Sequence, residues 1–202
     1  MHSIWQEQME FPIYPILKRD KKADILYVGA TLQHAVEAHF QKEAGKAVMI
    51  IEEKSIADMP ELGGMGILKA TNMNELKDLC ILRNYIIKYH VPCDLEIISE
   101  TSIQVHPIKL FLFMTKDIEV YEQTKITARE GKRLDMESAY IDAGQVIEDN
   151  KPYEKRYIHV FSEADFPEIT KPDILEIRKY KDNYLVLSHQ RELEGSQRYW
   201  EI

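Results

Sequence analysis

The stretch from residue 23 to residue 53 constrains the fold more than any other part of this 202-residue chain. It reads as a buried strand over residues 25–28, a tight turn at Gly29, a helix that stops at Gly45, and a second apolar strand over residues 48–52. Parallel strands that are covered on both faces show such continuous apolar runs, and a helix is the usual connection between them. The pattern therefore predicts a βαβ unit in which these two strands pair in parallel.

In a dinucleotide-binding βαβ unit, the turn after the first strand holds the pyrophosphate, because free N–H groups and the helix dipole attract anions there. The predicted pyrophosphate site is the backbone of Gly29, Ala30, Thr31 and Leu32. An acidic residue about 20 positions later usually binds the ribose hydroxyls, and Glu52 has that spacing and ends the second strand. The sequence leaves open a second role for Glu52, that of a strand-end carboxylate facing water.

The turn itself departs from the G-x-G-x-x-G pattern. That pattern uses glycine for the tight turn, for the approach of the pyrophosphate and for close helix–strand packing. Only Gly29 is present, while Thr31 stands at the second glycine position and His34 at the third. Thr31 brings a side chain to the phosphate-binding backbone, and His34 is bulkier than the packing position normally allows. The sequence therefore predicts the fold of a dinucleotide site and leaves open whether a dinucleotide still binds.

Composition limits the classes of partner and compartment. The chain is 45% apolar and 30% charged, as soluble globular proteins are, and its net charge of −8 argues against nucleic acid and anionic membranes as partners. No apolar run is long enough to span a bilayer, and the N-terminus lacks a signal-peptide pattern. Cys80 and Cys93 are expected to be reduced packing thiols. These features predict a cytoplasmic protein.

Beyond the βαβ unit the chain becomes rich in strands. Asn72 and Glu75 predict the start of a helix that ends near Pro92, and Pro107 predicts a further helical turn. Alternation is clearest over residues 118–127, and a strand pair is expected around Gly144 within residues 137–147. The other predicted strands cover residues 94–99, 102–105, 157–161, 174–179 and 184–188. The order predicts a three-layer α/β half with an antiparallel sheet attached.

Four blocks of sequence together resemble the FAD-dependent oxidoreductases of the D-amino-acid oxidase and glycine oxidase type. The first is an aromatic arm followed by the βαβ unit, and the second is a worn glycine-rich loop that begins with Gly63 and Gly64. The third joins V-H-P-I-K-L at residues 105–110 to the strand at residues 118–127. The fourth comprises the strands at residues 157–161 and 174–187, which are similar to those of the family's substrate domain.

The resemblance implies a fold, a cofactor and a reaction. The fold is α/β, with a Rossmann-like FAD/NAD(P)-binding parallel sheet and an attached antiparallel substrate-domain-like sheet. The FAD-binding-like domain would comprise residues 1–90 and about 118–150. The antiparallel substrate-domain-like region would comprise about 91–117 and 151–202. FAD, bound in part by Gly63 and Gly64, would accept a hydride from an amine or amino acid. A homo-oligomer and a hetero-oligomer are both open for the chain.

The departures from the family support alternatives to an enzyme. Two turn glycines are replaced, the helix after Pro107 is short, and family members continue beyond the length of this chain through a segment that binds FAD and carries a substrate-binding arginine. No residue here matches that segment, so the catalytic residues stay unknown. A non-catalytic relative acting as a partner-binding or regulatory protein is one alternative, and one subunit of a hetero-oligomeric dehydrogenase is the other.

Other candidate sites in the sequence have simpler explanations. His34 and His39 are five positions apart, which does not suit a two-histidine metal pair, so no metal is expected. Tyr157, Arg178, Tyr180 and Tyr184 are candidates for lining a substrate pocket. Alternation within an antiparallel sheet explains these four residues without a function.

Overall fold

A computed structural model describes residues 3–6, 9, 11–59, 62, 64–148, 155–162, 166, 174–189, 191, 193 and 196–201. Its largest sheet has six strands in the order β6-β2-β1-β9-β8-β7. The first four run parallel, and β9, β8 and β7 continue as an antiparallel meander. The strands are β1 (Lys21–Val28), β2 (Val48–Ile51), β6 (Glu119–Tyr121), β7 (Ala128–Glu130), β8 (Arg133–Asp135) and β9 (Tyr140–Glu148).

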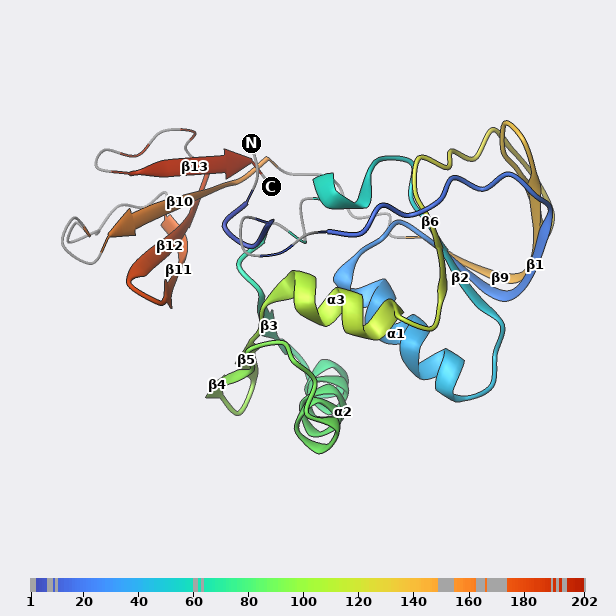
Figure 1. The fold of residues 1–202 in the computed structure, drawn as a ribbon. Coiled ribbons are helices and arrows are strands. Elements are labelled where there is room, and N and C mark those ends of the chain that lie inside the picture. Colours follow the sequence, from blue (N-terminus) through green and yellow to red (C-terminus); the bar gives the residue numbers. More distant parts are fainter. Residues whose placement is uncertain are drawn as a thin grey trace.

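The predicted βαβ unit is confirmed. Strands β1 and β2 pair in parallel from Ile25 opposite Val48 to Val28 opposite Ile51, with helix α1 (Leu32–Glu43) between them in the chain. Gly45 has a φ of 83°, a left-handed backbone that suits glycine just after a helix end. Helix α1 lies beside helix α3 (Pro107–Thr115), and both are next to the sheet (Figure 1).

The two faces of the six-stranded sheet are covered differently. Ile25, Tyr27 and Ile50 share one core with residues of all three α-helices. On the other face Leu26, Met49 and Ile51 pack with Leu17, Leu134 and Met136 and, in the described part of the chain, with no helix. The layers that cover the sheet are therefore the helices on one face and, among the described residues, an extended segment and β8 on the other.

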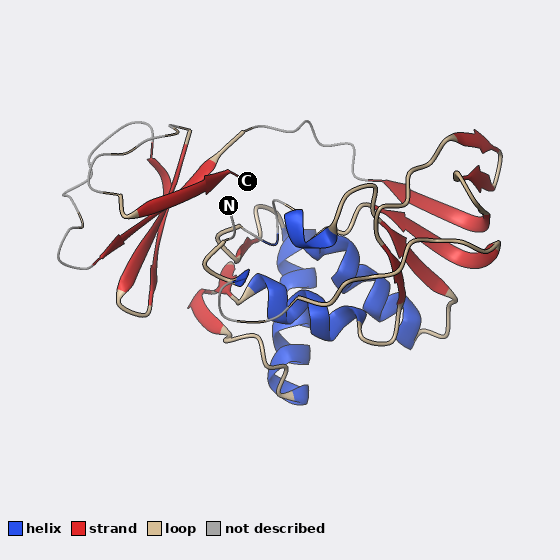
Figure 2. Cartoon of the chain, turned by 45° about the horizontal axis from the view of Figure 1, so that its top comes forward, coloured by secondary structure: helices blue, strands red, loops and turns tan. Residues whose placement is uncertain are grey.

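Two smaller antiparallel sheets complete the architecture. Sheet B has the order β3-β5-β4 beside helix α2, and sheet C has the order β11-β12-β10-β13. Figure 2 shows the helices between sheet C on one side and the six-stranded sheet on the other. The bounds are β3 (Ile67–Lys69), α2 (Met73–Tyr89), β4 (Glu96–Ser99), β5 (Ser102–Gln104), β10 (Tyr157–Ser162), β11 (Ile174–Tyr180), β12 (Asn183–Ser188) and β13 (Arg198–Glu201), with a short helix η2 (Ile56–Asp58).

Two predicted strands differ in the structure. The strand expected over residues 118–127 ends after Tyr121, because Gln123 adopts a left-handed φ of 49° and turns the chain so that the Thr124 N–H donates to the Glu52 carbonyl at 2.8 Å. Gly144 lies inside the continuous strand β9 and not at a turn. A Cβ at Gly144 would lie 2.8 Å from the Asp24 carbonyl oxygen, so the close approach of β1 explains the glycine.

The attached antiparallel sheet is confirmed by sheet C, whose strands β11 and β12 are joined by the Lys181 turn. The domain boundaries proposed at residues 90, 118 and 150 stay predictions.

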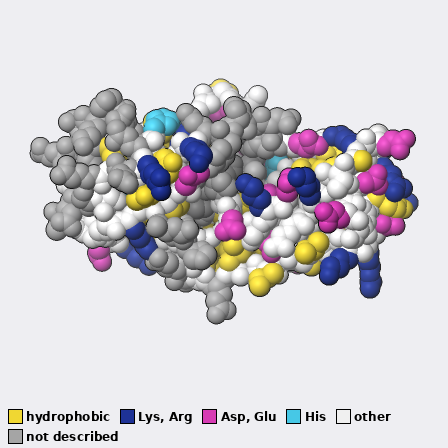
Figure 3. Space-filling model, turned by 90° about the horizontal axis from the view of Figure 1, so that it is seen from above, with side chains coloured by type: hydrophobic (Ala, Val, Ile, Leu, Met, Phe, Trp, Pro, Cys, Tyr) yellow, Lys and Arg dark blue, Asp and Glu magenta, His cyan; other side chains and the backbone are white. Residues whose placement is uncertain are grey.

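Among the residues described, no helix combines the length and the apolar character that spanning a bilayer requires. Basic and acidic side chains are interspersed over the six-stranded sheet on the face shown in Figure 3.

Candidate functional site

The turn between β1 and α1 lies where a dinucleotide-binding protein of this topology would hold a pyrophosphate. Gly29 has a φ of 99°, and its N–H donates to the Ile51 carbonyl at 2.8 Å. The Ala30 N–H donates to Glu52 Oε2 at 3.0 Å. Thr31 is the N-cap of α1, and its Oγ1 accepts the His34 N–H at 3.0 Å. Side chains of the protein therefore satisfy two of the N–H groups around the turn.

His34 closes the turn. Its Nδ1 lies 2.8 Å from the Gly29 carbonyl oxygen, and because a carbonyl only accepts, Nδ1 carries the proton and donates it. The imidazole is 4% exposed, and its ring lies 5.2 Å from the ring of Tyr27 in β1. An ideal Cβ on Gly29 would meet His34 Nδ1 at 3.9 Å. The side chain at the third glycine position thus lies against the first glycine.

Glu52 is held by the backbone on both carboxylate oxygens. Oε2 accepts the Ala30 N–H, and Oε1 accepts the Lys54 N–H at 2.9 Å. The side chain is 7% exposed, in contrast to Glu53, which pairs with Lys125 at 2.8 Å on the surface. Glu52 is therefore not a carboxylate that simply faces water. Its role as a ribose ligand stays a prediction, as does that of Ala30, Thr31 and Leu32 toward a pyrophosphate.

The glycine-rich loop lies under the N-terminal arm. Gly63 falls outside the described residues. The Gly64 carbonyl accepts the Trp5 Nε1–H at 2.9 Å, and Trp5 is completely buried. Gly66 has a φ of 67°, and a Cβ there would overlap the Val105 carbonyl oxygen. The loop is thus packed against protein groups, and a role for Gly63 and Gly64 toward FAD stays a prediction.

The structure adds a buried cluster around the cation Arg178 that the sequence indicated only through that residue. Arg178, in β11, is 3% exposed and donates Nη1–H groups to the carbonyls of Met65 and Val105. Its guanidinium carbon lies 4.7 Å from the centroid of the Trp5 ring. His106, the N-cap of α3, is fully buried against the same ring at 4.9 Å. Neither Trp5 nor His106 stands in a sequence pattern that indicates this meeting.

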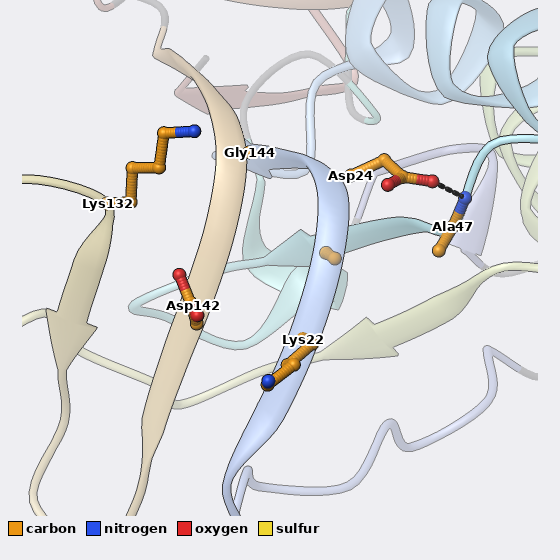
Figure 4. Close-up of a pocket in the computed structure, with 7 residues that line it drawn as sticks. Lys22, Asp24, Ala47, Lys132, Asp142 and Gly144 are labelled. Carbon is orange, nitrogen blue, oxygen red and sulfur yellow. Dashed lines mark hydrogen bonds between the residues drawn. The ribbon is translucent and has the colours of Figure 1, made fainter.

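A pocket of about 380 Å³ lies at the other end of β1, and it is a poor candidate for a cofactor site. Its lining comprises Lys22, Ala23, Asp24, Ala47, Lys132, Asp142 and Gly144 (Figure 4). Asp24 Oδ2 accepts the Ala47 N–H at 2.8 Å, which ties β1 to the start of β2. The charged side chains around the pocket are exposed and of both signs. The described residues also contain no group of three His, Cys, Asp or Glu side chains that could hold a metal ion.

Solved structures similar to this chain include glycine oxidases and a probable FAD-dependent monooxygenase. Glycine oxidase from Bacillus cereus ATCC 14579 superposes with a TM-score of 0.60 over 81% of this chain and 70% of its own, at 12% identity. PqsL, described as a probable FAD-dependent monooxygenase from Pseudomonas aeruginosa, gives a TM-score of 0.53 over 83% of this chain and 60% of its own, at 12% identity. Glycine oxidase from Geobacillus kaustophilus gives 0.53 over 82% and 70%, again at 12% identity.

At this level of identity the likeness establishes a shared fold. The predicted resemblance and the predicted fold class, a Rossmann-like parallel sheet with an attached antiparallel sheet, are confirmed at that level. No family model matches the sequence, and no curated protein does. The chain spans only 60% of the length of PqsL, so activities of whole flavoenzymes do not transfer with the fold.

The residues of the turn do not fit an adenine dinucleotide. A pyrophosphate at this position requires backbone N–H groups that are open to it and small residues at the second and third glycine positions. Here Thr31 carries its side chain at the second position and uses it as a cap, and the His34 ring is hydrogen-bonded to the Gly29 carbonyl. The space beside the helix N-terminus is thus taken by the protein's own side chains.

Proposed function

We propose that this chain is a non-catalytic protein with the fold of FAD-dependent oxidoreductases, which acts as a partner-binding or regulatory protein. The observation that carries the proposal is the hydrogen bond between His34 Nδ1 and the Gly29 carbonyl. For a pyrophosphate to bind, the buried imidazole would have to leave this site. Breaking its hydrogen bond and leaving the partner unsatisfied costs about 1–3 kcal/mol before any gain from the ligand.

A second candidate is a flavin-dependent amine or amino-acid oxidoreductase, alone or as one subunit of a hetero-oligomer. Glu52 supports it, because a carboxylate at the end of β2 and hydrogen-bonded to the turn is where ribose hydroxyls bind in this topology. The closed turn weighs against both.

Flavin binding separates the candidates. The purified chain is incubated with excess FAD, desalted and examined for flavin absorbance, and FAD and NAD are titrated by calorimetry. We expect a colourless protein with no heat of binding. Flavin absorbance that remains after desalting would contradict the proposal and support the oxidoreductase.

A double variant tests the stated cause. Thr31→Gly with His34→Gly removes both side chains from the turn and should bind an adenine dinucleotide more tightly than the parent. Glycine at His34 costs about 1 kcal/mol of helix stability, and glycine at the Thr31 cap only a few tenths. Gln33→Gly is the matched control, since Gln33 is exposed on the same helical turn and should give no gain. Unchanged binding in a folded double variant would show that the turn is not the obstacle.

Size-exclusion chromatography of the native complex tests the partner role. Elution of the flavin-free chain as a monomer, as a homodimer or in a complex with a flavin-free partner agrees with a regulatory protein. A flavin-containing subunit that co-elutes with the chain would instead support a component of a dehydrogenase.

A further inference from the structure

The cluster of Arg178, His106 and Trp5 contains buried hydrogen-bond donors that the protein does not use. It lies where β11, the start of α3, the loop before β3 and the N-terminal arm meet. Arg178 directs Nη1 to the carbonyls of Met65 and Val105, and its guanidinium stacks over Trp5. Its Nε is fully buried and has no hydrogen-bond partner.

Among the described residues, no carboxylate forms an ion pair with Arg178. The two carboxylates whose charges act on it, Asp94 and Glu96, have other partners. Asp94 pairs with Lys109 at 2.8 Å, and Glu96 accepts a hydrogen bond from the Gln104 amide at 2.9 Å. Burial lowers the pKa of Arg178 to about 10, so the guanidinium still carries its charge at neutral pH. A buried charge without a counter-charge is costly.

His106 supplies a second unused donor. Its Nδ1 accepts the Lys109 N–H at 3.4 Å as the N-cap of α3, so the proton of the neutral ring is on Nε2. That Nε2 is buried and has no partner. Burial, with Lys109 nearby, lowers the pKa of His106 to about 4, so the ring is a neutral donor at pH 7.

We propose that Arg178 Nε–H and His106 Nε2–H form a binding site for a small monovalent anion of the halide class, such as chloride. Both side chains contact the same Trp5 ring, and Arg178 is bonded to the carbonyl of Val105, the residue next to His106. An anion would accept from both donors and also neutralise the guanidinium, whereas a water molecule would accept from them without neutralising the charge. The N-terminus of the nine-residue helix α3 adds a favourable dipole.

The buried surroundings favour a one-atom anion over a carboxylate or a phosphate. The Nη1 side of Arg178 has no space for an anion, since a Cβ on Gly66 would lie 2.7 Å from Nη1 and 3.1 Å from Pro107 Cδ. Ile103, Val105 and Ile108 around the site are all completely buried. The contacts of Arg178, His106 and Trp5 described above do not include the turn at Gly29, so the site holds or fails independently of the proposed function.

The first test is chloride-dependent stability. The free energy of unfolding of the full chain is measured by urea titration at pH 7 while sodium gluconate is replaced by sodium chloride at constant ionic strength. At a chloride concentration roughly ten times the dissociation constant, the unfolding constant should fall about tenfold. Bromide should act as chloride does, and acetate should have a much smaller effect. Equal stabilisation by acetate and chloride would overturn the halide assignment.

A matched pair of variants locates the effect. His106→Asn keeps an oxygen that can cap α3 and removes the Nε2–H donor, so it should lose the chloride response. His90→Asn makes the same exchange at the exposed left-handed end of α2 and should keep the response. A chloride response that survives in His106→Asn would overturn the site.

Crystals of the parent grown in sodium bromide give a readout that needs no variant. An anomalous bromide peak within hydrogen-bond distance of Arg178 Nε supports the proposal. An ordered water at that position, with no anomalous signal, would overturn it.

Discussion

His34, His39 and His106 each use specific ring nitrogens for hydrogen bonds within the protein. His34 donates Nδ1–H to the Gly29 carbonyl, and His106 accepts a backbone N–H at Nδ1. His39 lies 3.1 Å from the Met114 carbonyl with Nδ1 and 2.7 Å from the Tyr85 hydroxyl with Nε2. All three rings are buried. These buried imidazoles are structural, and that of His106 also makes stability depend on pH.

Acid should destabilise the protein through His106. Its pKa is lowered to about 4 by burial first and then by Lys109, with Arg178 acting in the same direction and Asp94 against it. The folded pKa lies below the value of about 6.5 for an unfolded histidine. The contribution of His106 to the free energy of unfolding is therefore present above about pH 6.5 and is lost as the pH falls toward 4. The loss amounts to about 3 kcal/mol at 1.36 kcal/mol per pKa unit.

The measurement compares the parent with His106→Asn by urea unfolding between pH 7.5 and 4 in gluconate buffer. The variant lacks this titration, so the difference in unfolding free energy between the two proteins should shrink as the pH falls. Carboxylates such as Glu119, whose pKa is lowered by Lys21, titrate in both proteins and cancel in the difference. A difference that stays constant over this range would contradict the prediction.

At the scale of helices and strands, local patterns predicted what depends on local physics. The apolar runs around residues 25–28 and 48–51 became paired parallel strands, and Asn72 caps α2 by accepting the N–H groups of Asn74 and Glu75. The length of β6 was not predictable from alternation, because a turn at Gln123 and a long-range bond from Thr124 to Glu52 end the strand. The end of a strand therefore depends on the hydrogen-bond partners that the tertiary structure offers its backbone.

Gly144 shows the same limit, and it yields a prediction. Its position suggested a turn, but the residue is a glycine because the Asp24 carbonyl would lie 2.8 Å from a Cβ. Gly144→Ala should therefore destabilise the protein by about 1–3 kcal/mol, since the β1–β9 pairing must shift. Gln145→Ala, at the neighbouring exposed position in β9, should change stability by less than about 0.5 kcal/mol. Thermal or urea unfolding of both variants measures this, and equal effects would refute the steric explanation.

Helix α2 is attached to α1 by a chain of polar contacts from His39 through the Tyr85 hydroxyl to Glu43. Tyr85→Phe should cost about 1 kcal/mol, the usual net value of such a hydrogen bond. Burial, with the bond to Glu43, raises the pKa of Tyr85 to about 12. Because the folded pKa lies above the unfolded value of about 10, this stability is complete below pH 10 and declines as the pH rises toward 12.

Urea unfolding at pH 8 and pH 11 tests the contact. The parent should lose more stability over this interval than Tyr85→Phe does. Tyr89→Phe, which changes a half-exposed ring on the same helix, is the control and should retain the parent's alkaline decline. Identical declines in the parent and Tyr85→Phe would exclude Tyr85 as the titrating group.

At the scale of the whole molecule, sheet C is tied to the rest of the chain by residues far apart in sequence. The Trp5 ring lies 4.5 Å from the Tyr180 ring, and its Nε1–H donates to the Gly64 carbonyl. Arg178 donates to the carbonyls of Met65 and Val105, which lie outside sheet C. Lys69 in β3 also pairs with Glu176 in β11. The sequence predicted strands β10, β11 and β12 of sheet C but not β13, and it contains no information on which distant aromatic would cover them. The site at Arg178 could therefore be found only in three dimensions.

Removing Trp5 should loosen sheet C before the parallel sheet. Trp5→Ala leaves a cavity in the core and should cost about 3–5 kcal/mol, and hydrogen exchange should accelerate most in the amides of β11 and β12. Amides of β1 and β2 should keep most of their protection, because their partners are each other, β6 and β9. Ile13→Ala, at a position in the same arm that is 91% exposed, should leave exchange unchanged throughout. Equal acceleration in β1 and β11 would mean instead that the parallel sheet and sheet C open as one cooperative unit and that the arm does not fasten one onto the other.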